Sequence, residues 1–377
     1  MPLILTGTSS STTLDSSAGL TFSDSSNQSA AASPYVLKNR IINGDCRIDQ
    51  RYAGAATANT ISGYVIDRWQ VIQSTTGKLI AQQNAGAVTP PTGFTNYFGV
   101  TSQSSYSVGA TDYYLMRQII EGFNVADLGW GTANAKTVTI SFWVRSSLTG
   151  AFGLTVSNYS GARYYPSTYT INSANTWEYK TVTIPGDTSG TWLTNNTGGP
   201  NIDFAMGVGS TYSGTVNTWG GGSFIFAATG STSVVGTNGA TFYITGVQLE
   251  QNTSATPFER RLYNQELANC QRYYWKWVPS SVYSNLGVGI SGTATTAYIV
   301  TGKLPVTMRV SPAIATPSNC RIYDGTSVAV TAISGNFSSV DYFTCDMTTA
   351  SGLTSTRVAM FGANVSLSAS VEFNSEL

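Results

Sequence analysis

Aromatic side chains stand beside amide, hydroxyl and guanidinium groups in two polar segments, SNYSGARYYPSTY (157–169) and TWLTNNTGGPN (191–201). An aromatic ring can stack on the apolar face of a pyranose, while neighbouring amides and hydroxyls hydrogen-bond to the sugar hydroxyls. The sequence therefore predicts a sugar-binding surface. Its candidate contacts come from segments that we expect to be loops: Trp130, Asn158, Tyr159, Arg163, Tyr164, Tyr165, Tyr169, Trp192 and Trp219.

Packing in a core or an interface is the alternative role for each of these aromatic residues. The 157–169 segment is the strongest candidate, because we expect a loop, not alternating strand positions, to supply its tyrosines. Trp69, Trp143 and Trp177 lie within or beside expected strands, and we predict that they belong to a core.

Catalysis is not expected. The chain contains no histidine, which removes the commonest general base and the commonest metal ligand. Paired carboxylates could still cleave a glycosidic bond. The available carboxylates form no recognisable motif: Asp112, Glu121, Asp127, Glu178, Asp187 and Asp203. We therefore predict no enzyme activity, no cofactor and no metal. Calcium held by Asp45 and Glu250 is the one metal alternative, because both are expected on neighbouring terminal strands.

The composition is that of an uncharged polar β-protein. Of 377 residues, 10% are charged and 41% hydrophobic, and the net charge is zero. A balanced charge offers no electrostatic surface for nucleic acid. No apolar run of about 18 residues is present, so we expect no membrane insertion. The start, MPLILTGTSSS, has no basic leader, which predicts synthesis in the cytoplasm.

The four cysteines, Cys46, Cys270, Cys320 and Cys345, are widely spaced and form no CxxC pair. This spacing fits neither a zinc site nor a disulfide-rich scaffold. We expect buried free thiols, and Cys320–Cys345 is the only pair for which a bridge is considered.

Residues 1–37 differ from the rest of the chain, because they are rich in Ser, Thr and Ala with only isolated apolar residues. Such a segment buries too little apolar surface to fold alone. The spaced Leu and Phe residues favour a docking arm that adds strands to a partner, and a flexible leader is the alternative.

Residues 38–260 predict one large two-sheet β-sandwich, since apolar and polar residues alternate between Gly, Pro, Asn and Ser turns. The expected strands are 137–146, 151–160, 177–185, 203–210, 222–230 and 240–250. The run 113–130 fits a strand followed by a short helix or loop.

One helix is expected, from Tyr263 to Trp277, within a linking segment at 261–279. The aromatic residues at 273–277 would surround its end, which suggests packing at a three-fold axis or between domains. Residues 280–377 predict a second, small β-sandwich or barrel. Its expected strands are 285–292, 296–306, 327–335, 340–349, 355–363 and 365–374.

Charged residues near the two ends of the large domain predict local ion pairs. Asp45, Asp49 and Asp67 are expected to pair with Arg47, Arg51 and Arg68. At the other end, Glu250 and Glu259 are expected to pair with Arg260, Arg261 or Arg40, which would tie the first strand to the last.

Two paired motifs frame the large domain. NRIINGDCRIDQRYAG (39–54) and YVIDRW (64–69) open it, and ITGVQLEQNTSATPFERR (244–261) and ELANCQRYYWKW (266–277) close it. Together they resemble a recurrent part of tailed-bacteriophage and prophage virion proteins, in which such motifs bracket a carbohydrate-binding-module-like jelly roll. The resemblance covers roughly residues 38–278.

The resemblance implies a virion protein, most simply a tail fibre that presents β-domains to a host-surface glycan. Residues 1–37 would anchor it to other virion proteins, such as a tail adaptor or portal-proximal protein, and the chain would be a homotrimer. The alternatives are a capsid decoration or head-fibre protein without a receptor role, and a glycan-depolymerising tailspike.

Overall fold

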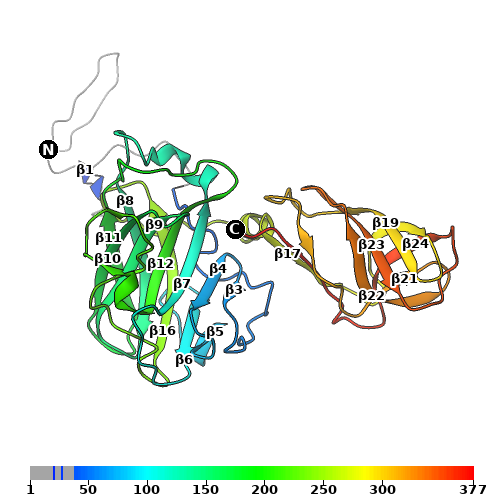
Figure 1. Ribbon diagram of the computed structural model, residues 1–377, viewed down its shortest axis with the longest axis horizontal. Coiled ribbons are helices and arrows are strands. Elements are labelled where there is room, and N and C mark those ends of the chain that lie inside the picture. Colours follow the sequence, from blue (N-terminus) through cyan, green and yellow to red (C-terminus); the bar gives the residue numbers. More distant parts are fainter. Residues whose placement is uncertain (1–19, 22–26, 29–37) are drawn as a thin grey trace, which may run out of the picture. The chain divides into compact units, whose positions relative to one another are not determined.

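The computed structural model describes residues 38–377 and two short strands before them, β1 (Leu20–Thr21) and β2 (Asn27–Gln28) (Figure 1). The chain divides into two compact units, Met1–Lys38 and Asn39–Leu377. In the first unit, β1 and β2 pair in antiparallel fashion. The predicted virion-anchoring role of residues 1–37 otherwise falls outside the described residues.

The second unit begins with a β-sandwich. Its seven-stranded sheet has the order β14–β10–β9–β12–β7–β4–β3. These strands are β3 (Gly63–Ile66), β4 (Trp69–Gln73), β7 (Tyr113–Glu121), β9 (Gly150–Asn158), β10 (Arg163–Ile171), β12 (Gly198–Val208) and β14 (Gly220–Gly221). Neighbours in this sheet pair in antiparallel fashion.

The second sheet of the sandwich has five antiparallel strands in the order β11–β8–β16–β6–β5. They are β5 (Leu79–Gln83), β6 (Phe98–Ser102), β8 (Val138–Ser146), β11 (Glu178–Ile184) and β16 (Thr241–Glu250). Short elements lie between the strands: η1 (Ala85–Ala87), η2 (Gly122–Leu128), η3 (Ser210–Tyr212) and the parallel pair β13 (Ser213–Gly214) and β15 (Ala227–Ala228).

Alternation places the core between the two sheets. In β8, Ile140, Phe142 and Val144 are fully buried. The ring of Phe142 meets that of Phe204 from the opposite sheet at 5.0 Å in an edge-to-face contact. Burying such side chains is the main favourable contribution to folding. The predicted all-β class is confirmed, and so is the strand followed by a short helix at 113–130.

The opening motif is held against β16 and the segment that follows it. Arg40 N donates to Leu249 O at 2.9 Å, and Asn39 N donates to Glu259 Oε2 at 2.6 Å. Arg261 donates to the carbonyl oxygens of Asn39 and Ile41. The expected tie between the two ends of the domain therefore exists, but Arg261 makes it largely through backbone carbonyls.

The local ion pairs are only partly as predicted. Asp45 does pair with Arg47, at 3.2 Å. Arg51 and Arg68, however, both pair with Glu376. Local pairing was wrong for these two, because the fold brings a carboxylate from the far end of the sequence to them.

Arg40, Arg261 and Glu250 also have partners other than the predicted ones. Arg40 pairs with Asp127 at 2.6 Å, and Arg261 pairs with Glu266 at 3.1 Å. Glu250 accepts hydrogen bonds from Thr256 N (2.8 Å) and Thr256 Oγ1 (2.7 Å). In the described residues, no group of three or more Cys, Asp or Glu side chains is arranged to hold a metal ion.

The predicted helix ends early. Helix α1 spans Tyr263–Gln271, and Tyr274–Trp277 forms strand β17, which pairs in antiparallel fashion with β25 (Val371–Asn374). The prediction of helix was therefore wrong for 274–277. Aromatic residues favour a strand when a neighbouring strand is available for pairing. Trp275 stacks on Phe373 at 4.9 Å, so these aromatic residues do not surround a helical end.

Residues 285–363 form a closed six-stranded barrel in the order β18–β19–β23–β22–β21–β24, which confirms the expected second β-structure (Figure 1). Its strands are β18 (Asn285–Ser291), β19 (Thr296–Lys303), β21 (Cys320–Tyr323), β22 (Ser327–Asn336), β23 (Tyr342–Thr349) and β24 (Val358–Ala363). A separate three-stranded sheet, β17–β25–β20, includes β20 (Ala313–Ile314).

Two expected strands are mostly absent. Of 222–230 only Ala227–Ala228 is a strand, and of 365–374 only Val371–Asn374. All four cysteines are free and buried, as expected, and burial raises the pKa values of Cys320 and Cys345 to about 12. No helix in the described part of the chain is long and apolar enough to cross a membrane.

Candidate ligand-binding site

The predicted sugar-binding segment 157–169 is not a loop. Strand β9 ends at Asn158 and β10 begins at Arg163, so only residues 159–162 form the turn between them. The alternation of β10 turns Tyr165 and Tyr169 inward, where each is 6% exposed. Tyr169 contacts Phe142 at 4.9 Å. These two tyrosines therefore belong to the sandwich core.

Three of the predicted tryptophans do meet, in one compact cluster. The ring of Trp130 lies 4.6 Å from that of Trp192 and 5.7 Å from that of Trp219, and Trp219 also contacts Tyr165 at 5.1 Å. The indole N–H groups of Trp130 and Trp219 donate to the carbonyl oxygens of Lys136 and Pro185. The three indoles thus pack on one another, although Trp192 and Trp219 remain partly exposed. A pocket of about 260 Å³ lies beside Trp130 and Trp192.

The polar candidates are also engaged within the protein. Both Nε and an Nη of Arg163 bind Asp187 at 2.7 Å. Asn158 is 3% exposed and donates to Thr191 O at 2.9 Å. Among the predicted contacts, Tyr159 is exposed (43%) and Tyr164 is half-buried.

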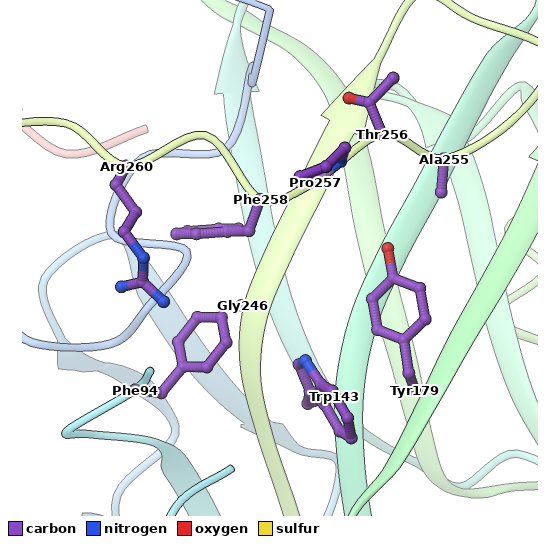
Figure 2. A pocket seen from close by; sticks show the side chains of 9 residues that line it. All are labelled: Phe94, Trp143, Tyr179, Gly246, Ala255, Thr256, Pro257, Phe258 and Arg260. Atoms are coloured by element: carbon purple, nitrogen blue, oxygen red, sulfur yellow. The ribbon is translucent and has the colours of Figure 1, made fainter. Parts of the chain in front are cut away.

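A larger cleft lies elsewhere, on the outer face of the five-stranded sheet (Figure 2). Its volume is about 700 Å³. Nine residues line it: Phe94, Trp143, Tyr179, Gly246, Ala255, Thr256, Pro257, Phe258 and Arg260.

Two strands supply a pair of aromatic rings on one side of this cleft. Trp143 of β8 is directly opposite Tyr179 of β11, and their rings are 5.5 Å apart. Phe142 and Val144 face the core, so the period of two turns Trp143 outward. Tyr179 is 42% exposed. This pair forms a hydrophobic platform that solvent can reach.

A second aromatic pair lies across β16 from this platform (Figure 2). Phe94 precedes β6, and Phe258 belongs to the closing motif; their rings are 5.3 Å apart in an edge-to-face contact. The guanidinium of Arg260 lies 4.5 Å from the ring of Phe94 and 5.6 Å from that of Phe258. Arg260 is therefore held at the cleft by two cation–π contacts.

Gly246 of β16 keeps the space between the two pairs open. A Cβ at this position would lie 2.6 Å from Cζ of Phe94 and 3.3 Å from Cδ1 of Trp143. Its φ of 62° is also one that other residues rarely adopt. The register shift between Thr245 and Gln248 accommodates this conformation within the strand.

The segment after β16 builds one wall of the cleft and is anchored to the sheet. Thr139 Oγ1 donates to Asn252 O at 2.9 Å. The hydrogen bonds from Thr256 to the carboxylate of Glu250 hold the middle of the segment. These hydrogen bonds hold the segment at Asn252 and Thr256, so this wall of the cleft is supported by the sheet.

The sequence did not predict the residues of this cleft as ligand contacts. Trp143 was predicted to be core, although the alternation of 137–146 contained the signal that it faces away from Phe142. Phe94, Phe258 and Arg260 had no such signal. Pairing between strands that are distant in the sequence brings these residues to the same cleft.

Comparisons with protein-family models and with curated proteins found no match. Among solved structures, the chain is similar to the enzymatically active domain of tailspike protein 4 from bacteriophage CBA120, at 13% identity and a TM-score of 0.31. That match covers 57% of this chain and 21% of the tailspike chain, so only about a fifth of the tailspike is spanned.

The other similar structures include carbohydrate-binding modules. One is a family 11 module from Clostridium thermocellum in complex with a β-1,3-1,4-mixed-linked tetrasaccharide (13% identity, TM-score 0.27, covering 52% of this chain and 96% of that chain). Another is TmCBM61 in complex with β-1,4-galactotriose (11% identity, TM-score 0.26, covering 52% of this chain and 100% of that chain). The expected similarity to carbohydrate-binding modules is therefore found, at a level that assigns no ligand.

Proposed function

We propose that this chain is a structural protein of a phage virion, a tail fibre whose β-sandwich binds a host-surface glycan in the aromatic cleft. The observation that carries the binding role is the solvent-accessible pair Trp143 and Tyr179 beside Phe94 and Phe258. Aromatic rings that border an open cleft suit the apolar faces of successive pyranose rings. The paired motifs at 39–69 and 244–277 support the virion assignment, with residues 1–37 as the anchor to other virion proteins.

Binding without cleavage is part of the proposal. Glycoside hydrolysis needs two carboxyl groups close to the scissile bond. Within the described residues, no Asp or Glu lines the cleft. The protein should therefore hold a glycan without shortening it, and release of oligosaccharides by the purified protein would contradict this.

The test is binding of the fluorescently labelled full chain to an array of bacterial surface polysaccharides and to the cells from which they come. We expect Trp143→Ala and Tyr179→Ala to lose most of the signal. Tyr342→Ala, at a tyrosine of the barrel that is 49% exposed, is the matched control and should bind like the unmodified chain. Equal binding by the Trp143→Ala variant would overturn the assignment of the cleft.

We also propose a homotrimer that associates through one face of the barrel. Neighbouring strands β18, β19 and β24 expose a group of apolar side chains: Val288 (44%), Ile290 (48%), Tyr298 (42%), Val300 (54%) and Val358 (68%). Ile290 is paired with both Tyr298 and Val358 in the sheet, so these three are adjacent. Contiguous exposed apolar side chains of this kind mark association surfaces, and this face supports the trimer expected of such appendages.

A further inference from the structure

Arg260 is a cation without an internal counterion. In the described part of the chain, no carboxylate or carbonyl group binds its guanidinium, whereas Arg40, Arg47 and Arg261 each have an acidic partner. Asp45 lies within electrostatic reach of Arg260, but the carboxylate of Asp45 is bound by Arg47. The charge of Arg260 is thus available to a ligand.

The two cation–π contacts use none of the N–H donors of Arg260 in a hydrogen bond to a described residue. Phe94 and Phe258 lie 4.5 and 5.6 Å from its central carbon. Such contacts act through the planar face of the group, while its N–H donors point outward in the plane. A guanidinium held in this way can donate two parallel hydrogen bonds to a planar anion such as a carboxylate.

The rest of the cleft favours the same kind of ligand. Its lining is otherwise aromatic, aliphatic or hydroxylic, and Arg260 is the one charged residue among the nine that line it. An anionic ligand would therefore meet no like charge among the residues that line the cleft, and Arg260 would attract it. Gly246 leaves the path between Arg260 and the Trp143–Tyr179 platform open (Figure 2).

We infer that the cleft selects acidic glycans: Arg260 binds the carboxylate of a uronic-acid-type sugar while a ring of the same chain stacks on Trp143 and Tyr179. This inference rests on the glycan binding proposed above and adds the chemical class of the ligand. The cleft would then have two parts. Any pyranose could stack on Trp143 and Tyr179, whereas Arg260 would bind only a sugar with a negative charge.

The experiment uses matched pairs of glycans. Uronate-containing bacterial polysaccharides of several backbones are compared with the same polysaccharides after chemical reduction of their carboxyl groups to primary alcohols. Binding of the full chain is measured by calorimetry at low and high salt. The variants are Arg260→Gln and Trp143→Ala, with Arg357→Gln, an exposed arginine of the barrel, as the control for loss of a surface charge.

We expect the unmodified chain to prefer an acidic glycan over its reduced form by about tenfold or more, as for a charge-assisted bidentate pair. Arg260→Gln should remove this preference and its salt dependence without weakening the binding of reduced glycans. Arg357→Gln should change neither.

The two proposals fail in different ways. If reduced glycans bind as tightly as acidic ones, or if Arg260→Gln leaves acidic binding unchanged, the selection for acidic glycans is wrong. The proposed function then still stands if Trp143→Ala abolishes the binding of neutral glycans. Binding that survives Trp143→Ala, or no binding to any member of the panel, rejects both proposals.

Discussion

The carboxylate of Glu376 is ion-paired with the guanidinium of Arg68, although 308 residues separate them. The side chains of Arg68 and Glu376 are only 1% and 4% exposed. Glu376 also binds Arg51 at 3.0 Å, and Tyr64 Oη donates to Leu377 O at 3.1 Å. The last residues of the sequence are thus part of the same buried network as the YVIDRW motif.

Removing this carboxylate should therefore be costly. Glu376→Gln leaves the buried charge of Arg68 without a counterion, and we expect the free energy of unfolding to fall by about 3 kcal/mol or more. Urea denaturation followed by fluorescence measures it. Glu372→Gln is the control, because Glu372 pairs with Lys276 but its side chain is 40% exposed. That control should lose less than about 1 kcal/mol. Equal losses of unfolding free energy in the two variants would contradict a stabilising role for the buried ion pairs of Glu376.

Asp67 predicts a specific pH dependence. Burial raises its pKa from 3.8 to about 6, against the opposing effect of its hydrogen bonds from Gln50. Between pH 4 and 6 the folded state holds a proton that the unfolded state has released. The contribution of Asp67 to stability is therefore present below about pH 4 and is lost as the pH rises towards 6.

The measurement is the free energy of unfolding of the unmodified chain and of Asp67→Asn at pH 4, 5, 6 and 7. As the pH rises from 4 to 7, the unmodified chain should lose about 3 kcal/mol of unfolding free energy relative to Asp67→Asn. Most of this loss should occur by about pH 6, and the difference should then level off. A difference that does not vary with pH would show that Asp67 has an ordinary pKa.

A comparison of alanine variants at Gly246 and Gly239 distinguishes the effect of backbone strain from that of blocking the cleft. Gly246→Ala places a Cβ against Phe94 and should abolish glycan binding. Gly239 also has a positive φ, of 74°, but no atom lies within 4 Å of the Cβ that would be added there. We expect both alanine variants to lose about 1 kcal/mol of stability. Calorimetry should detect lost glycan binding only for Gly246→Ala. Loss in both variants would point to the backbone, and not to the cleft.

The barrel face predicts how the chain associates. Ile290→Lys places a charge among exposed apolar neighbours and should convert the proposed trimer to monomers, as measured by size-exclusion chromatography with light scattering. Val365→Lys is the control, since Val365 is 66% exposed but lies outside the barrel strands. A monomeric unmodified chain at micromolar concentration would reject the trimer, and a trimer that survives Ile290→Lys would reject this face.

Local pattern in the sequence was enough for much of the fold. The alternation of 240–250 and of 137–146 located β16 and β8 to within a residue, because burial on one face imposes a period of two. The same rule failed at 222–230, where most of the apolar residues lie outside strands. It also could not show that Tyr274–Trp277 is a strand, since that depends on β25 about a hundred residues later.

The candidate site was harder to predict for a related reason. Tyr165 and Tyr169 were assigned to a loop, although their spacing also fits one face of a strand. The cleft joins Phe94, Trp143, Tyr179 and Phe258 through the register of β8 with β11 and the course of the chain after β16. Pairing between distant strands is not encoded in any one segment, so composition indicated aromatic binding chemistry without its location.

The most direct test of the proposed glycan binding in the cleft is a crystal structure of the full chain with an oligosaccharide from the polysaccharide that gives the strongest signal in the array. The account predicts a pyranose ring stacked on Trp143 or Tyr179, with the chain of sugars passing Gly246 towards Arg260. An oligosaccharide bound instead at Trp192 and Trp219, or on the outer face of the seven-stranded sheet, with the cleft empty, would contradict it.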